Sequence, residues 1–335
     1  MRASVLVRAG EVVVEERAEP PAPAGDVLVR VSSVGVCGSD VHYYREGRIG
    51  DFVVEAPLVL GHEASGVIEA VGAGVDAGRV GERVSIEPQR PAGFSPEVLA
   101  GRYNLDPGME FFATPPVDGA FQELVSVPAH FAHPVPEAVS DDAAALMEPL
   151  SVGIAGARKA GVTVGDRVLI AGAGPIGLVL VQVARVFGAS EIVVTDVSPE
   201  RLSVAESMGA TEVADARSAD FAGQDRFTVF FDASGAAAAI TAGLRALGPA
   251  GRAVLIGMGA DEIPLPLALV QNKELTVTGT FRYANTWPTA IELVASGKVD
   301  LDALVSNHYG LDEVETALST TQDAGVLKNM VTPNA

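Results

Sequence analysis

The stretch RVLIAGAGPIGLVLVQVARVFGA, residues 167–189, restricts the fold of this chain more than any other segment. A short apolar run is followed by a glycine-rich turn and then by an apolar run long enough for a helix. Residues 172–177 fit the pattern G-x-G-x-x-G, and an acidic residue, Asp196, ends the next predicted strand. This combination is typical of a strand–turn–helix unit that binds a dinucleotide. The segment therefore predicts a parallel sheet with a cofactor site at the turn.

The glycines of this turn have separate tasks. Gly172 permits the tight bend, Gly174 lets a pyrophosphate approach the backbone, and Gly177 lets the helix pack closely on the strand. The free N–H groups and the dipole of the helix then stabilise the phosphate charge. Pro175 and Ile176 complete the turn, and we predict that all five residues bind the cofactor. A purely structural glycine turn is the alternative.

Asp196 bears on which dinucleotide is bound. Its carboxylate would accept hydrogen bonds from the adenosine ribose diol of NAD and would repel the 2′-phosphate of NADP. We therefore expect NAD to be favoured. Arg201 lies close in the sequence and complicates this expectation, because its positive charge could neutralise a phosphate.

Strands continue to alternate with helices beyond the turn, and this alternation predicts an α/β fold with a doubly wound parallel sheet covered on both faces. We assign residues 150–281 to this domain. The segments that carry the alternation are EIVVTDVSPERLSVAESMGA, FTVFFDASG, AAAAITAGLRAL, GRAVLIGMG and ELTVTGTF.

Residues 1–149 have a different character, with short β-rich runs punctuated by Gly and Pro, such as DVLVRVSSVGV and ASGVIEAVGAGV. They predict an antiparallel, barrel-like domain. The last part, residues 282–335, turns helical and is too short to fold alone, so we expect it to return and complete the first domain. A chain of 335 residues is long enough for two such domains.

Several classes of partner and location are disfavoured by composition. The net charge of −20 argues against nucleic acid and anionic lipid as partners. The sequence has no uncharged apolar stretch of membrane-spanning length and no apolar run typical of a signal peptide. A single cysteine excludes an internal disulfide, so we expect a cytoplasmic protein.

That single cysteine, Cys37, stands in GVCGSDVHYY, while His62 and Glu63 precede a strand in LGHEASGVIEAVG. Glu148 follows in LMEPLSVG, where the two predicted domains meet. Cys, His and Glu are residue types that bind zinc. The spacing alone does not establish a metal site, and it favours the interpretation of a buried thiol, a hydrogen-bonded histidine and two solvated acids.

The chain resembles the zinc-dependent medium-chain alcohol dehydrogenases, and among them the sorbitol/xylitol (polyol) dehydrogenases. The matching segments run in family order over nearly the whole length. They are GVCGSDVHYY, GHEASGVIEAVGAGV, YNLDPGMEFFATPPVDGAF, MEPLSVG, AGAGPIGL and GTFRYANTWP. This resemblance implies a GroES-like β-rich catalytic domain, a Rossmann domain for NAD, and a C-terminal return to the first domain.

The resemblance also implies roles for the acidic and sulfur-bearing residues. Cys37, His62 and Glu63 match the ligands of one catalytic zinc. Glu148 matches a carboxylate that either binds the zinc or holds its water. Asp40 matches a residue that orients His62, as metal-bound imidazoles commonly require.

The remaining expected site residues also come from the resemblance. Ser39 and His42 match the start and end of a proton relay. The expected substrate residues are Tyr43, Phe111, Glu148, Arg282 and Tyr283, and further cofactor residues are Gly257, Phe281 and Arg282. Donors such as Arg282 suit a polyol better than an apolar alcohol.

A second, structural zinc of the family should be absent. Its four cysteine positions fall on Ala92, Ser95, Val98 and Asp106, none of which is a thiol. We expect packing to hold this loop instead.

The resemblance thus implies an NAD-dependent, zinc-dependent enzyme that oxidises a polyol such as xylitol or sorbitol to a ketose. Its relatives are often tetramers, so a homo-oligomer is expected. The alternatives are a dehydrogenase of another substrate (2,3-butanediol, L-threonine or a sugar acid) and a non-catalytic cofactor-binding protein.

Overall fold

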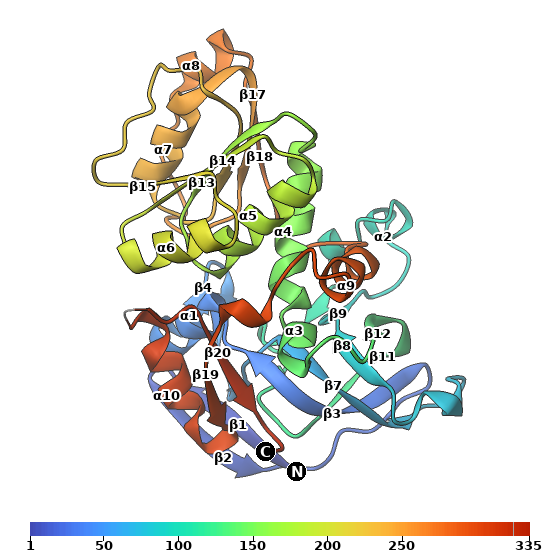
Figure 1. The fold of residues 1–335 in the computed structure, drawn as a ribbon. Helices are drawn as coiled ribbons and strands as arrows, with labels where there is room; N and C mark the ends of the chain where they lie inside the picture. Colours follow the sequence, from blue (N-terminus) through green and yellow to red (C-terminus); the bar gives the residue numbers. More distant parts are fainter. Residues whose placement is uncertain (324) are drawn as a thin grey trace. The chain divides into compact units, whose positions relative to one another are not determined.

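The computed structural model describes residues 1–323 and 325–335, which form two compact units (Figure 1). Unit 1 comprises Met1–Glu148 and Trp287–Ala335, and unit 2 comprises Pro149–Thr286. The chain re-enters unit 1 at Trp287 rather than at residue 282. There the indole N–H of Trp287 donates a hydrogen bond of 2.8 Å to Ser85 Oγ, and the ring is fully buried.

Unit 1 is rich in short strands, as the alternating segments predict. Its strands are β1 (Arg2–Arg8), β2 (Glu11–Glu16), β3 (Asp26–Gly35), β4 (Arg48–Ile49), β5 (Phe52–Val53), β6 (Leu58–Val59), β7 (Glu63–Val71), β8 (Arg83–Ile86), β9 (Gln89–Arg90), β10 (Glu110–Phe111), β11 (Leu124–Pro128), β12 (Ala132–Pro134), β19 (Val305–Gly310) and β20 (Lys328–Thr332). The largest sheet has the order β12-β8-β7-β3-β20-β19, with β11 also paired to β3. In Figure 1 the red C-terminal strands lie beside the blue β3, so the chain end does return to this unit.

The core of unit 1 follows from the alternation in β3. Val27, Val29 and Val31 point to one side of the strand and are fully buried. The helices of the unit are α1 (Gly38–Glu46), α2 (Pro96–Leu99), α3 (Asp141–Ala145), α9 (Trp287–Ala295) and α10 (Val314–Ser319), while α4 (Met147–Ala160) runs from unit 1 into unit 2. Single-turn 3-10 helices lie at Ala77–Arg79, Tyr103–Leu105, Ala129–Phe131, Asp302–Leu304, Leu311–Glu313 and Thr320–Gln322.

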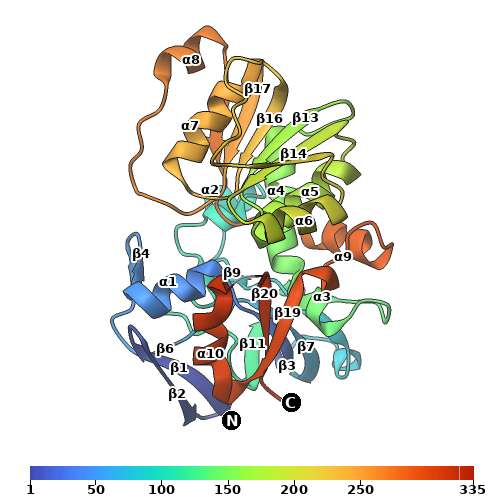
Figure 2. The same ribbon diagram turned by 60° about the vertical axis from the view of Figure 1, so that its left-hand side comes forward.

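Unit 2 is the predicted parallel sheet. Its strands are β13 (Arg167–Ala171), β14 (Glu191–Asp196), β15 (Glu212–Asp215), β16 (Phe227–Asp232), β17 (Leu247–Leu255) and β18 (Thr276–Gly279), in the order β15-β14-β13-β16-β17-β18. The connecting helices are α5 (Pro175–Val186), α6 (Pro199–Ser207), α7 (Ala237–Ala246) and α8 (Leu267–Asn272) (Figure 2). The strand order reverses beside β13, which is where doubly wound folds bind dinucleotides.

Local signals set the helix starts of unit 2 as expected. Ser198 caps α6, and its Oγ accepts a hydrogen bond from the N–H of Arg201 at 3.3 Å. Gly174 is the N-cap of α5 and Pro175 is the first residue of that helix, a position where the missing N–H of proline is tolerated. Asp196 ends β14, as the sequence predicts.

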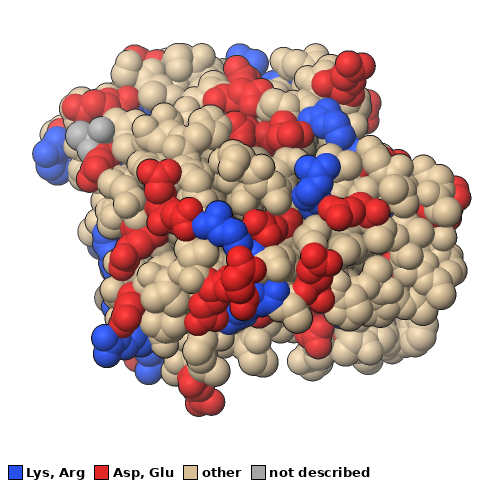
Figure 3. All heavy atoms as spheres, turned by 90° about the horizontal axis from the view of Figure 1, so that it is seen from below, with Lys and Arg blue, Asp and Glu red and all other residues tan. Residues whose placement is uncertain are grey.

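The net charge of the chain is negative. On the face drawn in Figure 3, acidic side chains are more prominent than basic ones, and the two signs are interspersed. No helix within residues 1–323 and 325–335 has the length and apolar character needed to cross a membrane.

The loop expected to rest on packing is instead held by a carboxylate. Asp106 Oδ2 accepts a hydrogen bond of 2.7 Å from the N–H of Ala92. This bond lowers the pKa of Asp106 most, and bonds from the Ser95 side chain and the Gly108 backbone lower it further. The two ends of the loop also meet closely, since a Cβ on Gly108 would lie 2.5 Å from the Cβ of Ala92. Asp106 therefore contacts the backbone of Ala92 and the side chain of Ser95. These are two of the other three positions at which the resemblance places cysteine ligands.

Removing this carboxylate should loosen the loop without unfolding unit 1. In Asp106→Ala we expect faster amide hydrogen exchange and faster proteolysis within residues 92–108, because the donors of Ala92 and Gly108 lose their acceptor. The pKa of Asp106 is lowered by the hydrogen bonds that its carboxylate accepts from the loop. These bonds therefore stabilise the loop fully above the ordinary pKa range of a carboxyl group, and they are lost as the pH falls through the lowered pKa. Glu19→Ala, at an exposed carboxylate of the same unit, is the control. Equal protection of the loop in both variants would contradict this role.

Candidate functional site

Strand register brings Cys37 and Glu63 together. β3 and β7 pair antiparallel, with Gly35 opposite Glu63, and Cys37 follows β3 directly as the N-cap of α1. A Cβ at Gly35 would lie 2.1 Å from Glu63 Oε2, so a side chain at this position would displace the carboxylate from its present place. His62 immediately precedes β7, so the same strand pair fixes all three side chains.

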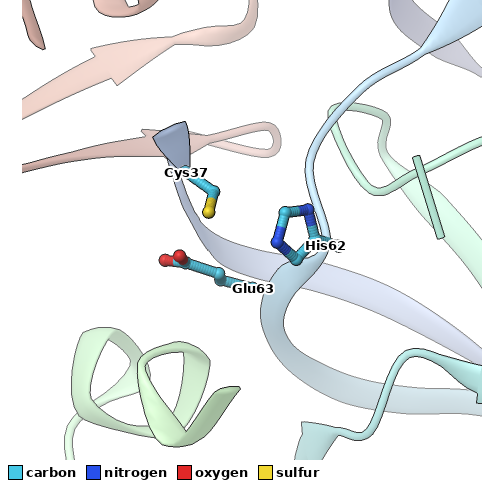
Figure 4. A group of neighbouring side chains, drawn as sticks. All are labelled: Cys37, His62 and Glu63. Atoms are coloured by element: carbon cyan, nitrogen blue, oxygen red, sulfur yellow. The ribbon is translucent and has the colours of Figure 1, made fainter. Parts of the chain in front are cut away.

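These side chains form a cluster that could hold a metal ion. One ligand atom from each of Cys37, His62 and Glu63 lies within 4.8 Å of the others. Figure 4 shows the sulfur of Cys37 between the imidazole ring of His62 on one side and the carboxylate of Glu63 on the other. His62 and Glu63 are buried, with 6% and 1% of their surfaces exposed. Among the residues that the structure describes, this is the group with metal-ligand character, and its thiol, imidazole and carboxylate are ligand types that zinc takes at about 2.0–2.3 Å.

Asp40 holds the two segments that carry the cluster. Its Oδ2 accepts the N–H of Cys37 at 2.9 Å, and its Oδ1 accepts the N–H of Gly61 at 2.9 Å. The carboxylate is fully buried. His62 Nδ1 lies 3.7 Å from Asp40 Oδ1, so the predicted contact with the imidazole is present as an electrostatic contact beside these two backbone bonds.

Lys328 on β20 is a part of this site that sequence reasoning missed. Its Nζ donates to Glu63 Oε1 at 2.7 Å and Oε2 at 2.8 Å, and to the carbonyl of Val36 at 2.9 Å. The side chain is buried, with 3% of its surface exposed. The available signal was a lone lysine at the start of the apolar strand KNMVT, which is unusual because buried lysines need a partner.

Neighbouring charges shift the pKa values of His62 and Lys328. Burial alone would lower the pKa of His62, but the charges of Cys37 and Asp40 and the hydrogen bonds to both raise that pKa well above its usual value. Burial would likewise lower the pKa of Lys328, and the charge of Glu63 raises it on balance, with further contributions from Cys37 and Glu148. Lys328 therefore stays charged and neutralises Glu63.

Four other residues of unit 1 are expected in the site, and the structure places them as follows. The ring of Phe111 is 5.6 Å from that of His62, centroid to centroid. Glu148 is buried and close enough to influence the pKa of Lys328, but it is outside the 4.8 Å group. Tyr43 on α1 is buried. His42 on the same helix is half exposed, and its Nδ1 lies 3.6 Å from Glu46.

Ser39 stands in the first turn of α1 and is half-buried, two residues after Cys37. Its position beside the cluster is therefore fixed by the same helix start. The structure leaves the proposed relay between Ser39 and His42 as a prediction.

The glycine-rich turn of unit 2 has the geometry that a pyrophosphate needs. Gly172 has φ of 100°, in the left-handed region that favours glycine. A Cβ on Gly177 would lie 1.9 Å from the carbonyl oxygen of Gly172, so helix α5 and the turn are in direct backbone contact. A Cβ on Gly174 would meet no atom within 4 Å, which leaves the space above the N-terminus of α5 open. These features fit a bound dinucleotide phosphate.

Asp196 joins this turn to the next strand. Its Oδ2 accepts the N–H of Ala173 at 2.6 Å, and its Oδ1 accepts the N–H of Ser198 at 2.9 Å. A pocket of about 480 Å³ opens beside it, lined by Ala171, Thr195 and Val197 among others. This volume falls within the range of about 300–1,000 Å³ typical of small-molecule sites. The unit therefore has a glycine-rich turn that could hold a phosphate and, close to it, a pocket large enough for a small molecule.

The remaining cofactor and substrate residues expected in unit 2 are placed as follows. A Cβ on Gly257 would lie 2.1 Å from the N of Gly235, so the loops after β16 and β17 touch there. The guanidinium of Arg282 lies 4.7 Å from the ring centroid of Phe281, and Tyr283 is buried. Arg201 is half-buried at the start of α6. Their contacts with a ligand stay predictions.

Comparison with known proteins gives a consistent result over the whole chain. A family model described as an alcohol dehydrogenase GroES-like domain matches residues 23–137, and one described as a zinc-binding dehydrogenase matches residues 175–296. The chain is 40% identical over 344 residues to the sorbitol dehydrogenase of Bacillus subtilis (strain 168), covering 100% of this chain and 98% of that protein.

Solved structures agree with this similarity. L-idonate 5-dehydrogenase from Escherichia coli superposes with a TM-score of 0.94 at 32% identity, covering 99% of this chain and 98% of the other. A protein described as a short chain alcohol dehydrogenase, from Escherichia coli CFT073 and complexed with NADH, gives 0.93 at 30% identity and covers 99% of both chains. A zinc-binding dehydrogenase from Sinorhizobium meliloti 1021 bound to NADP gives 0.92 at 29% identity, again covering 99% of both.

The contribution of Lys328 to stability should depend on whether a metal ion is bound by Cys37, His62 and Glu63. In Lys328→Met the Glu63 carboxylate stays buried without its cation, which should lower the free energy of unfolding by about 3–5 kcal/mol in chelator-treated protein. A zinc ion in the cluster would supply positive charge to Glu63, so saturating zinc should recover part of the loss. Thermal unfolding with chelator and with zinc measures both values, and Lys298→Met, at an exposed lysine of unit 1, is the control. An identical loss under both conditions would show that Lys328 and the cluster are not coupled.

Proposed function

The chain belongs to the zinc-dependent medium-chain alcohol dehydrogenases, in the sorbitol dehydrogenase family, and from that premise we propose its reaction. The protein oxidises a secondary alcohol of a polyol to a ketone and passes the hydride to a nicotinamide dinucleotide. The observation that carries this proposal is the buried cluster of Cys37, His62 and Glu63, whose donor atoms lie within 4.8 Å of one another. A non-catalytic protein on this fold would be expected to lose these ligands, and here all three are present.

The chemistry divides between the bound groups and the chain. When bound, zinc supplies Lewis-acid chemistry that makes an aliphatic alcohol acidic near neutral pH, and the dinucleotide supplies the hydride acceptor. The chain provides the ligands Cys37, His62 and Glu63, and Lys328 balances the charge of Glu63. We propose that the alcohol proton leaves through Ser39 Oγ, which passes a proton on toward His42 at the end of the relay, or through a water held by Glu148. Glu148 either binds the metal or holds a water for it.

Substrate recognition rests on groups that can bind several hydroxyls. We propose Tyr43, Phe111, Glu148, Arg282 and Tyr283 for this task. Phe111 has no hydrogen-bonding group and would only line the site, with its ring beside that of His62 in unit 1. Arg282 and Tyr283 add donors that an apolar alcohol would leave unused.

The preference for NAD rests on Asp196. Both carboxylate oxygens are held by backbone N–H groups, which fixes the charge at the end of β14, where a ribose diol would bind. Solved relatives bind NADH in one case and NADP in another, so the fold itself does not decide the preference. We propose a single catalytic zinc, no structural zinc, a homo-oligomer and a cytoplasmic location, for the reasons given from the sequence.

A substrate screen with metal analysis tests the function. We expect NADH formation with xylitol or sorbitol to exceed that with butanediol, and a chelator to abolish it. Cys37→Ala should lose zinc and turnover while it still binds NADH, because the dinucleotide site lies in unit 2. Metal analysis on the same samples should give one zinc per chain. Full activity of Cys37→Ala, or two tightly held zinc ions, would contradict the proposal.

Asp196→Ala tests the cofactor preference. The ratio of kcat/KM for NAD to that for NADP should fall about tenfold or more, since a hydrogen bond to a charged group contributes about 1.5–3 kcal/mol. Asp261→Ala, at an exposed carboxylate of the same unit, should leave the ratio unchanged. An unchanged ratio in Asp196→Ala would remove this residue from the ribose site.

A further inference from the structure

A second carboxylate and an arginine stand beside Asp196 at the end of the unit 2 sheet. β14 and β15 pair in parallel, and their last residues, Asp196 and Asp215, are partners in that pairing. The two backbones are therefore one strand spacing apart, about 4.8 Å. The N–H of Ala216 donates to the carbonyl of Asp196 at 3.0 Å, so the chain that leaves β15 passes directly beside the proposed ribose site.

Arg217 reaches back to both strand ends. Its Nε donates to Asp215 Oδ1 at 2.8 Å and its Nη2 donates to Asp215 Oδ2 at 2.8 Å, which makes a bidentate pair. The same Nη2 donates to the carbonyl of Val197 at 3.1 Å, one residue beyond Asp196. The guanidinium therefore lies across the ends of β14 and β15, beside the residue proposed to bind ribose.

A cation at this place bears on the choice between NAD and NADP. In doubly wound folds the acidic residue after the second strand binds the ribose 2′-hydroxyl, and an arginine nearby accommodates the 2′-phosphate of NADP. A guanidinium suits a phosphate because two of its N–H groups can donate in parallel. The side chain of Arg217 is 66% exposed, so a ligand can reach it. Arg217 would work against a preference for NAD unless its charge were compensated.

Asp215 compensates that charge. Its carboxylate accepts from Nε and Nη2, the edge of the guanidinium that would otherwise be open to a bidentate bond with phosphate. The backbone N–H of Arg217 also donates to Asp215 Oδ1 at 2.9 Å, which fixes the carboxylate in the turn. The hydrogen bond from the Arg217 side chain lowers the pKa of Asp215, so this carboxylate is ionised at neutral pH.

We infer that Asp215 is a second determinant of the preference for NAD, because it keeps Arg217 from binding a 2′-phosphate at Asp196. This inference rests on the proposed function. Asp196 disfavours NADP through its own charge, whereas Asp215 acts through Arg217 and is a positioning residue. Loss of Asp196 alone leaves Arg217 paired, so it weakens NAD without making a good site for NADP. Loss of the charge at Asp215 releases a cation where the 2′-phosphate would bind.

Asp215→Asn removes this charge with little disturbance of the turn. Asparagine is common in such turns, and its Oδ1 can still accept the backbone N–H of Arg217. Calorimetry on the zinc-loaded full chain gives the dissociation constants of NADP and NAD without any turnover. We expect NADP to bind about tenfold more tightly than to the unmodified protein, as for one charge-assisted hydrogen bond, and NAD to change by less than about threefold.

Adding Arg217→Ala to Asp215→Asn shows whether this arginine causes the gain. The double variant should lose the gain for NADP and bind NAD as before, with Arg201 left in place. Asp261→Asn makes the same change of net charge at an exposed carboxylate of unit 2 and should alter neither constant. The gain in Asp215→Asn should also shrink as the ionic strength rises, because salt screens exposed charges.

An unchanged dissociation constant for NADP in Asp215→Asn would overturn the inference and leave the proposed reaction standing. Equal tightening of NAD and NADP would overturn it too, since the effect would then lie at a part that the two ligands share. A gain that survives in the double variant would assign it to a cation other than Arg217. Failure of the unmodified protein to bind either dinucleotide would instead refute the proposed function, and with it the site at Asp196.

Discussion

The antiparallel register of β3 and β7 is the constraint on which the cluster of Cys37, His62 and Glu63 depends. Gly35 must face Glu63 for Cys37 to reach His62 and Glu63, and the missing side chain at Gly35 gives the carboxylate its space. Strand side chains alternate between faces, so a slip of one residue would turn Glu63 to the other side of the sheet. Asp40 secures this arrangement from α1 by binding the backbone next to each ligand. The cluster is thus a product of long-range pairing and not of a local motif.

The same cluster explains why the chain end returns to unit 1. A carboxylate as deeply buried as Glu63 needs a compensating charge, and none of the neighbouring residues in β3 or β7 supplies it. Lys328 brings that charge from β20, which pairs with β3 at Val34 and Gly35. Sheet order and electrostatics therefore agree, because the strand that pairs with β3 on this side of the sheet also carries the cation that neutralises Glu63.

The sequence predicted the parts of this protein that depend on local pattern. The turn at residues 172–177, the strand end at Asp196 and the cap at Ser198 were each readable within a few residues, because backbone geometry and capping act over short distances. The ligand set of Cys37, His62 and Glu63 required the family resemblance, since spacing alone left it open. Lys328 was missed because its partner is far away in the sequence, and no periodic pattern encodes such a pair.

The loop at residues 92–108 is held by a carboxylate at the place where the resemblance puts four cysteine ligands. A carboxylate has two oxygens that accept several hydrogen bonds, so Asp106 alone can hold the donors of Ala92, Ser95 and Gly108. These hydrogen bonds require no metal ion. They require only that the Asp106 carboxyl group is deprotonated, which its lowered pKa favours. In the proposed reaction the cluster of Cys37, His62 and Glu63 has no such substitute for a metal ion, because Lys328 can neutralise Glu63 but cannot polarise an alcohol. Depletion of zinc should therefore affect the chemistry of the protein while the Asp106 anchor of this loop stays in place.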